Sequence, residues 1–207
     1  MKLTPMAFAA MLLAGPALAQ QTRLPPISPE RYDDAQRTAA AEFEAARKRP
    51  PFGPFSKLIY SPEVMTAARS MGDHLRYKSA VGTVLSELVI LVTAREWSQD
   101  YEWSVHAPIA LKAGIRQDVV DAIAEGRRPG AMSPDEETCY DFSIELHRNK
   151  RVSDATYERA RSRFGDKGVV DLAAINGYYT FLAMAMNTAR MPVTEGPILS
   201  RFPDGGR

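Results

Sequence analysis

Two glutamates and a histidine, Glu87, Glu102 and His106, are the residues whose types and spacing suit proton-transfer chemistry. Glu87 stands inside the apolar run of residues 84–92, which has helical length. Glu102 and His106 are four residues apart, so on a helix they share one face, about 6 Å apart along the axis. Burial and mutual charge displace the pKa values of such groups toward neutrality, as general acid–base catalysis requires. A second interpretation stays open, a buried glutamate–histidine hydrogen bond that only satisfies core polar groups.

The helices that must position these residues follow from periodicity and capping signals, and they predict an all-α fold in a single domain. Proline after serine marks helix starts at Pro29, Pro62 and Pro134. Two segments, 83–97 and 166–189, are apolar almost all round, which is typical of core helices; polar residues inside the second argue against a membrane span. The predicted helices cover residues 29–48, 62–77, 83–97, 100–113, 117–125, 134–148, 153–164 and 166–189.

The first nineteen residues have the pattern of a secretory signal peptide. Lys2 supplies a positive charge, residues 6–14 are apolar, and Ala17 and Ala19 form a small-x-small cleavage site. The apolar run is too short to span a bilayer. We therefore expect cleavage after Ala19 and a periplasmic or secreted protein that has no membrane association afterwards. The predicted organisation is a signal peptide (1–19), a proline-rich, extended and mobile lead-in (20–30), the all-α domain (31–190) and an irregular tail (191–207).

Composition excludes several classes of function. Of 26 Lys and Arg residues one lies in the signal peptide, so the mature chain has 25 basic and 25 acidic residues. This neutral balance argues against a nucleic-acid partner, which would need a basic excess. Cys139 is the only cysteine, so no internal disulfide or CxxC redox pair can form, and we interpret it as structural.

The walls of a site can also be predicted. Gln99 and Trp103 lie on the same helical segment as His106, and Pro108 interrupts the hydrogen bonding of that helix one turn later. An organic-acid substrate would need an arginine for its carboxylate, and Arg95 and Arg76 are the nearest candidates in the sequence.

No cofactor is expected. Metal ligation by Glu87, Glu102, His106 and His147 is the alternative, but the sequence has no HExxH motif. Di-iron bundles use Glu-x-x-His, whereas Glu102 and His106 are separated by one residue more. We interpret His147 as a histidine near a helix C-terminus, where the helix dipole favours it, and His74 as an exposed histidine.

Several segments of the sequence together resemble the carboxymuconolactone decarboxylase family, whose fold is shared with the alkylhydroperoxidase AhpD-like proteins. The most specific part is Glu-Trp-x-x-His at residues 102–106, with Glu87 upstream. The resemblance covers roughly residues 50–190 and rests on segments 61–63, 85–91, 101–107, 113–114, 168–172 and 177–179. It implies an all-α fold that assembles into trimers or hexamers, with sites near subunit contacts.

The resemblance also implies that this site lacks the cysteine pair of the thiol peroxidase branch. In the thiol peroxidase branch a glutamate precedes a CxxC pair, and a histidine follows the second cysteine by four positions. Counted back from His106, the cysteine positions fall on Gln99 and Glu102, and the upstream glutamate on Glu87. Disulfide-forming peroxidase chemistry is therefore excluded at this position, and what remains resembles the decarboxylase branch.

The leading hypothesis is a cofactor-independent lyase or isomerase that acts on a small carboxylated or lactone-like organic acid. His106 would be the general acid/base, Glu102 its orienting partner or the second acid/base group, and Glu87 a tuning group. The alternatives are a non-catalytic periplasmic AhpD-like binding or assembly protein, and a peroxidase-like protein that lacks the thiol pair. Apolar side chains on a neutral surface, together with the resemblance, predict a homo-oligomer, a trimer or a hexamer.

Overall fold

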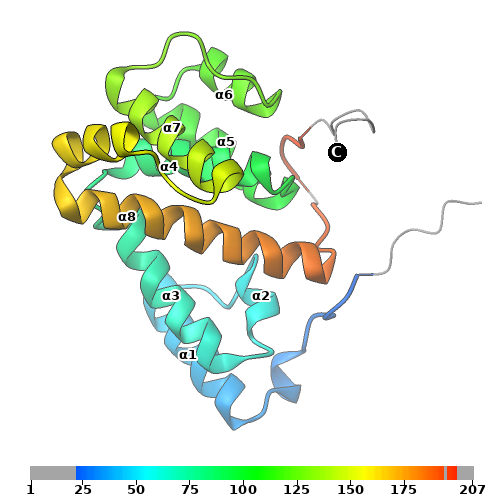
Figure 1. Ribbon diagram of the computed structural model, residues 1–207. Coiled ribbons are helices and arrows are strands. Elements are labelled where there is room, and N and C mark those ends of the chain that lie inside the picture. Colours follow the sequence, from blue (N-terminus) through cyan, green and yellow to red (C-terminus); the bar gives the residue numbers. More distant parts are fainter. Residues whose placement is uncertain (1–21, 194, 200–207) are drawn as a thin grey trace, which may run out of the picture.

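The computed structural model describes residues 22–193 and 195–199, and within them it contains helices and no strand. The predicted all-α fold is confirmed. The long helix α8 crosses the middle of the molecule, with α4 to α7 on one side and α1 to α3 on the other (Figure 1). The helices are η1 (Pro29–Arg31), α1 (Asp34–Arg47), α2 (Phe55–Leu58), α3 (Pro62–Tyr77), α4 (Thr83–Glu96), α5 (Asp100–Ala113), α6 (Gln117–Ala124), α7 (Pro134–Asn149) and α8 (Asp154–Ala189).

Helix α4 is the centre of the fold. Every residue from Ser86 to Arg95 is buried, and the helix packs against α5, α7 and α8. Its apolar residues face all directions because neighbouring helices surround it, as the sequence predicted. A carboxylate on α4 is consequently enclosed by protein wherever it points.

Helix α8 consists of two helical segments joined at Gly165, whose φ of 69° and ψ of 177° are not helical. Glycine adopts this conformation without the steric cost that a side chain would impose. Two helices predicted on either side of residue 165 are therefore confirmed as segments of one bent element. By length and composition α8 would suffice to cross a membrane, but half of its most apolar window is buried, and Asp171 and Asn176 lie inside it.

Capping decides the helix starts. Ser133 and Ser153 accept hydrogen bonds from backbone amides of the first turns of α7 and α8, as their sequence pattern predicts. The predicted start at Ser28–Pro29 is wrong for the α-helix, because only the short η1 forms there. Helix α1 begins at Asp34, where Asp33 and Gln36 form a reciprocal capping box.

The N-terminal lead-in is bound to the helical body where the structure describes it. The backbone amide of Arg23 donates to the Ala189 carbonyl at 2.8 Å. Lys57 Nζ donates to the carbonyl of Leu24 at 2.9 Å, and the Tyr60 hydroxyl to that of Pro25 at 2.8 Å. These contacts correct the expectation of a mobile lead-in for residues 23–25. The predicted signal peptide lies outside the described residues.

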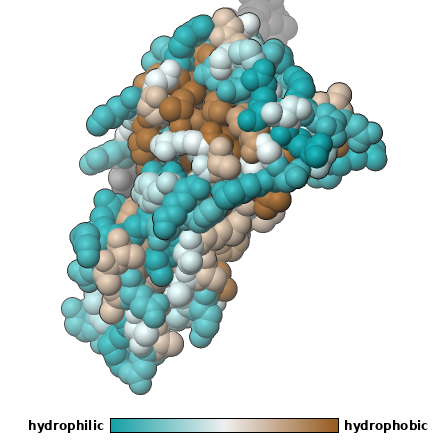
Figure 2. Space-filling model, turned by 90° about the vertical axis from the view of Figure 1, so that its left-hand side faces the viewer, coloured by the Kyte–Doolittle hydropathy of each residue, from teal (hydrophilic) through white to brown (hydrophobic). Residues whose placement is uncertain are grey.

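Apolar side chains also reach the surface. Figure 2 shows hydrophobic residues gathered on the upper part of the molecule, the part that holds α4 to α7, while the lower part is more hydrophilic. The large exposed hydrophobic residues include Tyr77, Val84, Val105, Val170 and Met184. Such surface is common where proteins associate, so the predicted homo-oligomer stays a prediction with this feature in its support.

Candidate active site

Three helices bring four charged side chains together beside α8. Glu87 comes from α4, Glu102 and His106 from α5, and Arg76 from α3. Nδ1 of His106 lies 2.6 Å from Glu87 Oε2, and Nε2 lies 3.3 Å from Glu102 Oε2. Arg76 Nη2 lies 3.8 Å from Glu87 Oε1. We call Arg76, Glu87, Glu102 and His106 the polar cluster.

Burial and charge set the protonation of His106. Burial lowers the pKa of the imidazole, but hydrogen bonds to Glu102 and Glu87 and the charges of both carboxylates outweigh it and raise the pKa to about 9. At neutral pH His106 is therefore an imidazolium that donates from both ring nitrogens. Two cations then face two anions, and the polar cluster as a whole is neutral.

One oxygen of the polar cluster is left over. Among the described residues, Glu102 Oε1 is buried and has no hydrogen-bond partner, although Oε2 of the same carboxylate contacts His106. A buried carboxylate oxygen without a donor is costly, so such atoms are rare in folded proteins. The free oxygen is where a proton from a bound molecule would be accepted.

Two tyrosines of α8 form an aromatic wall of the polar cluster. The Tyr179 ring meets the His106 ring edge-on, with centroids 5.3 Å apart, and Tyr178 packs perpendicular to Tyr179 at 5.2 Å. A Cβ atom at Gly72 of α3 would lie 2.8 Å from Tyr178 Cζ, so a glycine is needed there to seat the ring. The sequence pattern places residues 177–179 in a core helix, and no local signal in it marks Tyr179 as a neighbour of the histidine.

The two predicted wall residues, Trp103 and Gln99, differ in their surroundings. Trp103 is buried beside the polar cluster residues of α5. Gln99 is a helix cap: its Oε1 accepts from the amides of Tyr101 and Glu102, and its Nε2 donates to Asn187. These three bonds hold the Gln99 side chain at the start of α5, and its assignment to the substrate pocket stays a prediction.

The two arginine candidates are separated by the fold. Arg76 belongs to the polar cluster, and its side chain is 23% exposed, whereas those of Glu87, Glu102 and His106 are 3–5% exposed. Arg95 lies eight residues after Glu87, about 12 Å further along α4, and faces other neighbours. The polar cluster is thus closed within the single chain except at Arg76.

The polar cluster lies within the part of the chain that a family comparison recognises. The model of the carboxymuconolactone decarboxylase family matches residues 62–142, which include all four members. In these residues the chain is similar to the carboxymuconolactone decarboxylase family. No curated protein is similar enough in sequence to count as a relative.

Two solved structures are similar to this chain in fold. One is the alkylhydroperoxidase AhpD core, an uncharacterized peroxidase-related protein from Ralstonia eutropha JMP134, with a TM-score of 0.67 and 21% identity over 84% of this chain and 93% of that one. Another is an uncharacterized peroxidase-related protein from Silicibacter sp. TM1040, with a TM-score of 0.66 and 16% identity over 84% and 92%. At these identities the likeness shows the AhpD-like fold alone.

The remaining candidate residues lie outside the polar cluster. Cys139 is fully buried, and burial raises the pKa of its thiol far above its ordinary value, so it is a poor nucleophile. Nε2 of His147 lies 3.1 Å from Thr93 Oγ1, in a polar contact between α7 and α4. His74 is partly exposed and lies 3.1 Å from Asp171 Oδ1. Among the described residues no group of three His, Cys, Asp or Glu side chains is arranged to hold a metal ion; the absence of a cofactor stays a prediction.

Proposed function

We propose that the protein is an acid–base enzyme of the lyase or isomerase type that acts on a small carboxylated or lactone-like organic acid. The observation that carries the proposal is the arrangement of His106 between two carboxylates, one of which keeps a buried oxygen without a partner. A proton donor and a proton acceptor side by side, shielded from water, are the requirements of this chemistry.

The distances suggest separate roles for the two glutamates. Glu87, at 2.6 Å from Nδ1, orients the imidazole and stabilises its charge. The proton on Nε2 is the one delivered to the substrate, and the neutral imidazole that remains is still held by Glu87. Glu102 Oε1 accepts the proton that the substrate loses, so the pair moves one proton across the substrate without a cofactor. Arg76, the member nearest to solvent, binds the substrate carboxylate.

Thiol chemistry accounts for this site less well than acid–base chemistry does. The two structural neighbours are described as peroxidase-related proteins. In this sequence Gln99 and Glu102 occupy the positions of the thiol pair, and the side chain of Gln99 caps α5. A peroxidase-like activity would therefore need a mechanism without cysteine at this position.

A non-catalytic role is the second candidate, and one observation favours it. In the single chain the side chains of Glu87, Glu102 and His106 are all at least 95% buried, as expected of a polar network that only stabilises a core. The protein would then be a periplasmic binding or assembly protein that keeps the family fold.

Melting temperature and turnover of His106→Ala distinguish the two candidates. The substrate is first sought by screening lactones and unsaturated dicarboxylic acids against the purified mature protein. If His106 transfers a proton, turnover falls by about 10²–10⁴-fold in molecules that are still folded. The non-catalytic candidate instead gives a lower melting temperature and no activity in the wild-type protein toward any compound of the screen.

The setting of this function is part of the proposal. We propose that the mature protein acts in the periplasm or outside the cell, as a homotrimer or homohexamer. The signal-peptide pattern of residues 1–19 supports the location, and the exposed apolar side chains support the assembly. Light scattering at micromolar concentration tests the assembly, because a monodisperse monomer would contradict it.

A further inference from the structure

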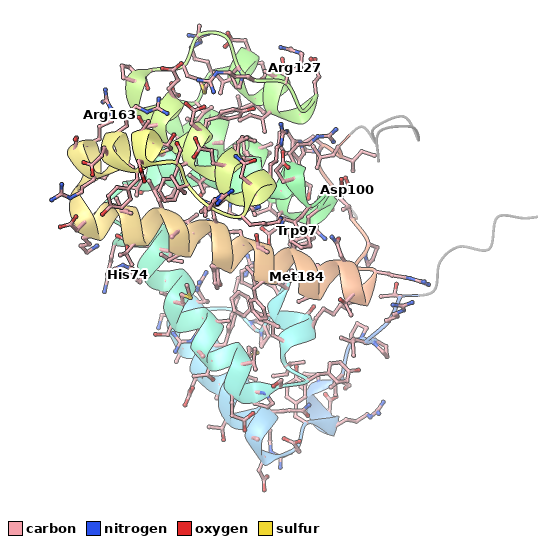
Figure 3. The ribbon with its side chains drawn as sticks, in the orientation of Figure 1. His74, Trp97, Asp100, Arg127, Arg163 and Met184 are labelled. Carbon is pink, nitrogen blue, oxygen red and sulfur yellow. The ribbon has the colours of Figure 1, made fainter. Side chains whose placement is uncertain are left out.

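Gln99 stands at the junction of three helices that carry the polar cluster or its aromatic wall. It follows the end of α4, it precedes the first residue of α5, and its side chain reaches the C-terminal part of α8. The residue is 3% exposed, and its backbone amide donates to the Ala94 carbonyl of α4 at 2.8 Å. Figure 3 shows the same junction, in which Trp97 and Asp100 lie beside the part of α8 that carries Met184. A shift of Gln99 would therefore move three helices relative to one another.

The hydrogen bonds of the Gln99 amide belong to a chain that has one direction. Asn187 Nδ2 donates to the Trp97 carbonyl at 3.0 Å, and Asn187 Oδ1 accepts from Gln99 Nε2 at 2.9 Å. Gln99 Oε1 then accepts from the backbone amides of Tyr101 at 2.6 Å and Glu102 at 3.2 Å. Because an amide oxygen only accepts and an amide nitrogen only donates, each side chain satisfies its partners in one orientation. The Trp97 carbonyl thus sets the orientation of both amides.

Glutamine is a long residue for the N-cap of an α-helix. The favoured N-cap residues are Asn, Asp, Ser and Thr, whose shorter side chains reach the backbone amides of the first turn. Such a side chain at position 99 would cap α5 but would be too short to reach Asn187 of α8. The length of Gln99 therefore serves the contact between α5 and α8 in addition to the cap.

The chain of hydrogen bonds ends at the carboxylate residue that contacts His106. The backbone amide of Glu102 donates to Gln99, and Glu102 Oε2 lies 3.3 Å from His106 Nε2. Glu102 Oε1 is buried and has no hydrogen-bond partner among the described residues. The direction of this free oxygen consequently depends on the backbone of the first turn of α5, which Gln99 holds.

We propose that Gln99 and Asn187 are positioning residues for the Glu102 carboxylate, which they keep at its contact distance from His106. The proposal rests on the acid–base function proposed above. Neither residue touches a reacting atom, and both act through the first turn of α5. Catalytic groups must be held within about 0.5 Å of their productive geometry, and hydrogen bonds from residues behind them supply this precision.

Gln99→Asn tests the proposal, because it keeps a neutral amide that can cap α5 but is one methylene too short to bind Asn187. NMR titration of the mature protein reads out the imidazole of His106, one of only three histidines in the chain. The pKa of His106 should fall from about 9 to roughly 8, because the Glu102 carboxylate no longer keeps its contact distance. Asn187→Ala should lower this pKa by the same amount, and the double variant should lower it no further.

Gln117→Asn is the matched control for the shortened amide. Gln117 begins α6, and its Nε2 donates to Asp121 at 2.8 Å on an exposed surface. The pKa of His106 should equal that of the wild type in this variant. An unchanged pKa of His106 in Gln99→Asn or in Asn187→Ala would overturn the proposal, even if the melting temperature fell. Shifts that add up in the double variant would overturn it as well, because the two residues would then act separately.

The titration needs no substrate, so it separates this proposal from the proposed function. A protein without turnover toward any compound would contradict the acid–base function, and the pKa of His106 in Gln99→Asn would still decide whether Gln99 positions Glu102. With a substrate in hand, Gln99→Asn should lower kcat by about tenfold and leave KM unchanged. An equal kcat in Gln99→Asn and wild-type protein would overturn the positioning role.

Discussion

The two polar regions of the molecule differ in how their charge is balanced and how closely protein surrounds them. In the polar cluster two carboxylates face an imidazolium and an arginine, and three of the four side chains are almost fully buried. The second region is the arginine group around Arg127 and Arg148, in which Arg127 pairs with Glu125 and Arg148 with Glu96 while both arginine side chains stay about half exposed. A buried group of charges must be neutral as a whole because an unpaired buried charge is costly, whereas half-exposed ion pairs contribute little to stability. The first region therefore suits proton transfer, and the second is a set of surface ion pairs.

The largest effect that would sharpen this comparison comes from Glu102→Gln. The substitution removes the acceptor oxygen, so turnover should fall by about 10²-fold or more. Loss of the carboxylate also lowers the pKa of His106 from about 9, so the decline of the rate on the alkaline side should begin at lower pH. A pH–rate profile measures both effects.

Glu87→Gln is the control for that variant. Glu87 makes the shorter contact with His106, at 2.6 Å against 3.3 Å, but both of its oxygens have partners. It should cost more stability and less turnover than Glu102→Gln. Equal turnover in wild-type and Glu102→Gln protein, at unequal melting temperatures, would leave the polar cluster a purely structural feature.

The free energy of unfolding should depend on pH through the polar cluster and not through the ion pair of Arg148 with Glu96. The pKa of His106 is about 9 in the folded protein and 6.5 as its ordinary value. Because the pKa of His106 is higher in the folded state, its proton stabilises the folded protein fully below pH 6.5. This stabilisation is lost as the pH rises to about 9. The free energy of unfolding should fall by about 3 kcal/mol over this interval, at 1.36 kcal/mol per pKa unit.

Urea denaturation at several pH values measures this loss. This loss of stability should be absent from His106→Gln. It should be unchanged in Arg148→Gln, because the guanidinium of Arg148 does not titrate in this range. A loss of the same size in His106→Gln would show that another group is responsible.

A smaller effect is expected at the aromatic wall of the polar cluster. Gly72→Ala places a methyl group against the buried Tyr178 ring, and the overlap should cost about 1–3 kcal/mol. Gly177→Ala is the matched control in α8, because no atom lies within 4 Å of its added Cβ atom, and alanine there should stabilise the helix slightly. Thermal unfolding of both variants gives the comparison. Equal melting temperatures would mean that Tyr178 moves aside freely.

The smallest effect should come from Cys139→Ser. The residue is buried in α7 and belongs to neither polar region. Turnover per folded molecule should equal that of the wild type, whatever the change in melting temperature. A large loss of turnover in the folded fraction would revive a thiol mechanism.

The sequence by itself determined the helices and the chemical pair at the centre. Periodicity and serine–proline caps placed α3 to α8 within a few residues, because these signals act within one or two turns. The short helix α2 was not predicted. The four-residue spacing of Glu102 and His106 likewise placed their side chains together on one helix. The start of α1 was misplaced, because the Asp33–Gln36 capping box competes with Ser28–Pro29 just upstream.

Only the tertiary structure decided which distant residues complete each site. Glu87 pairs with His106 because α4 packs against α5, and Arg76 joins them because α3 packs against α4. Tyr179 became a neighbour of the histidine through the packing of α8 against α4, while Arg95 was carried to the other end of α4. Gln99 had the right position for a wall residue, but its amide satisfies the open backbone groups at the start of α5. Such assignments depend on the packing of helices far apart in the chain, which no local spacing encodes.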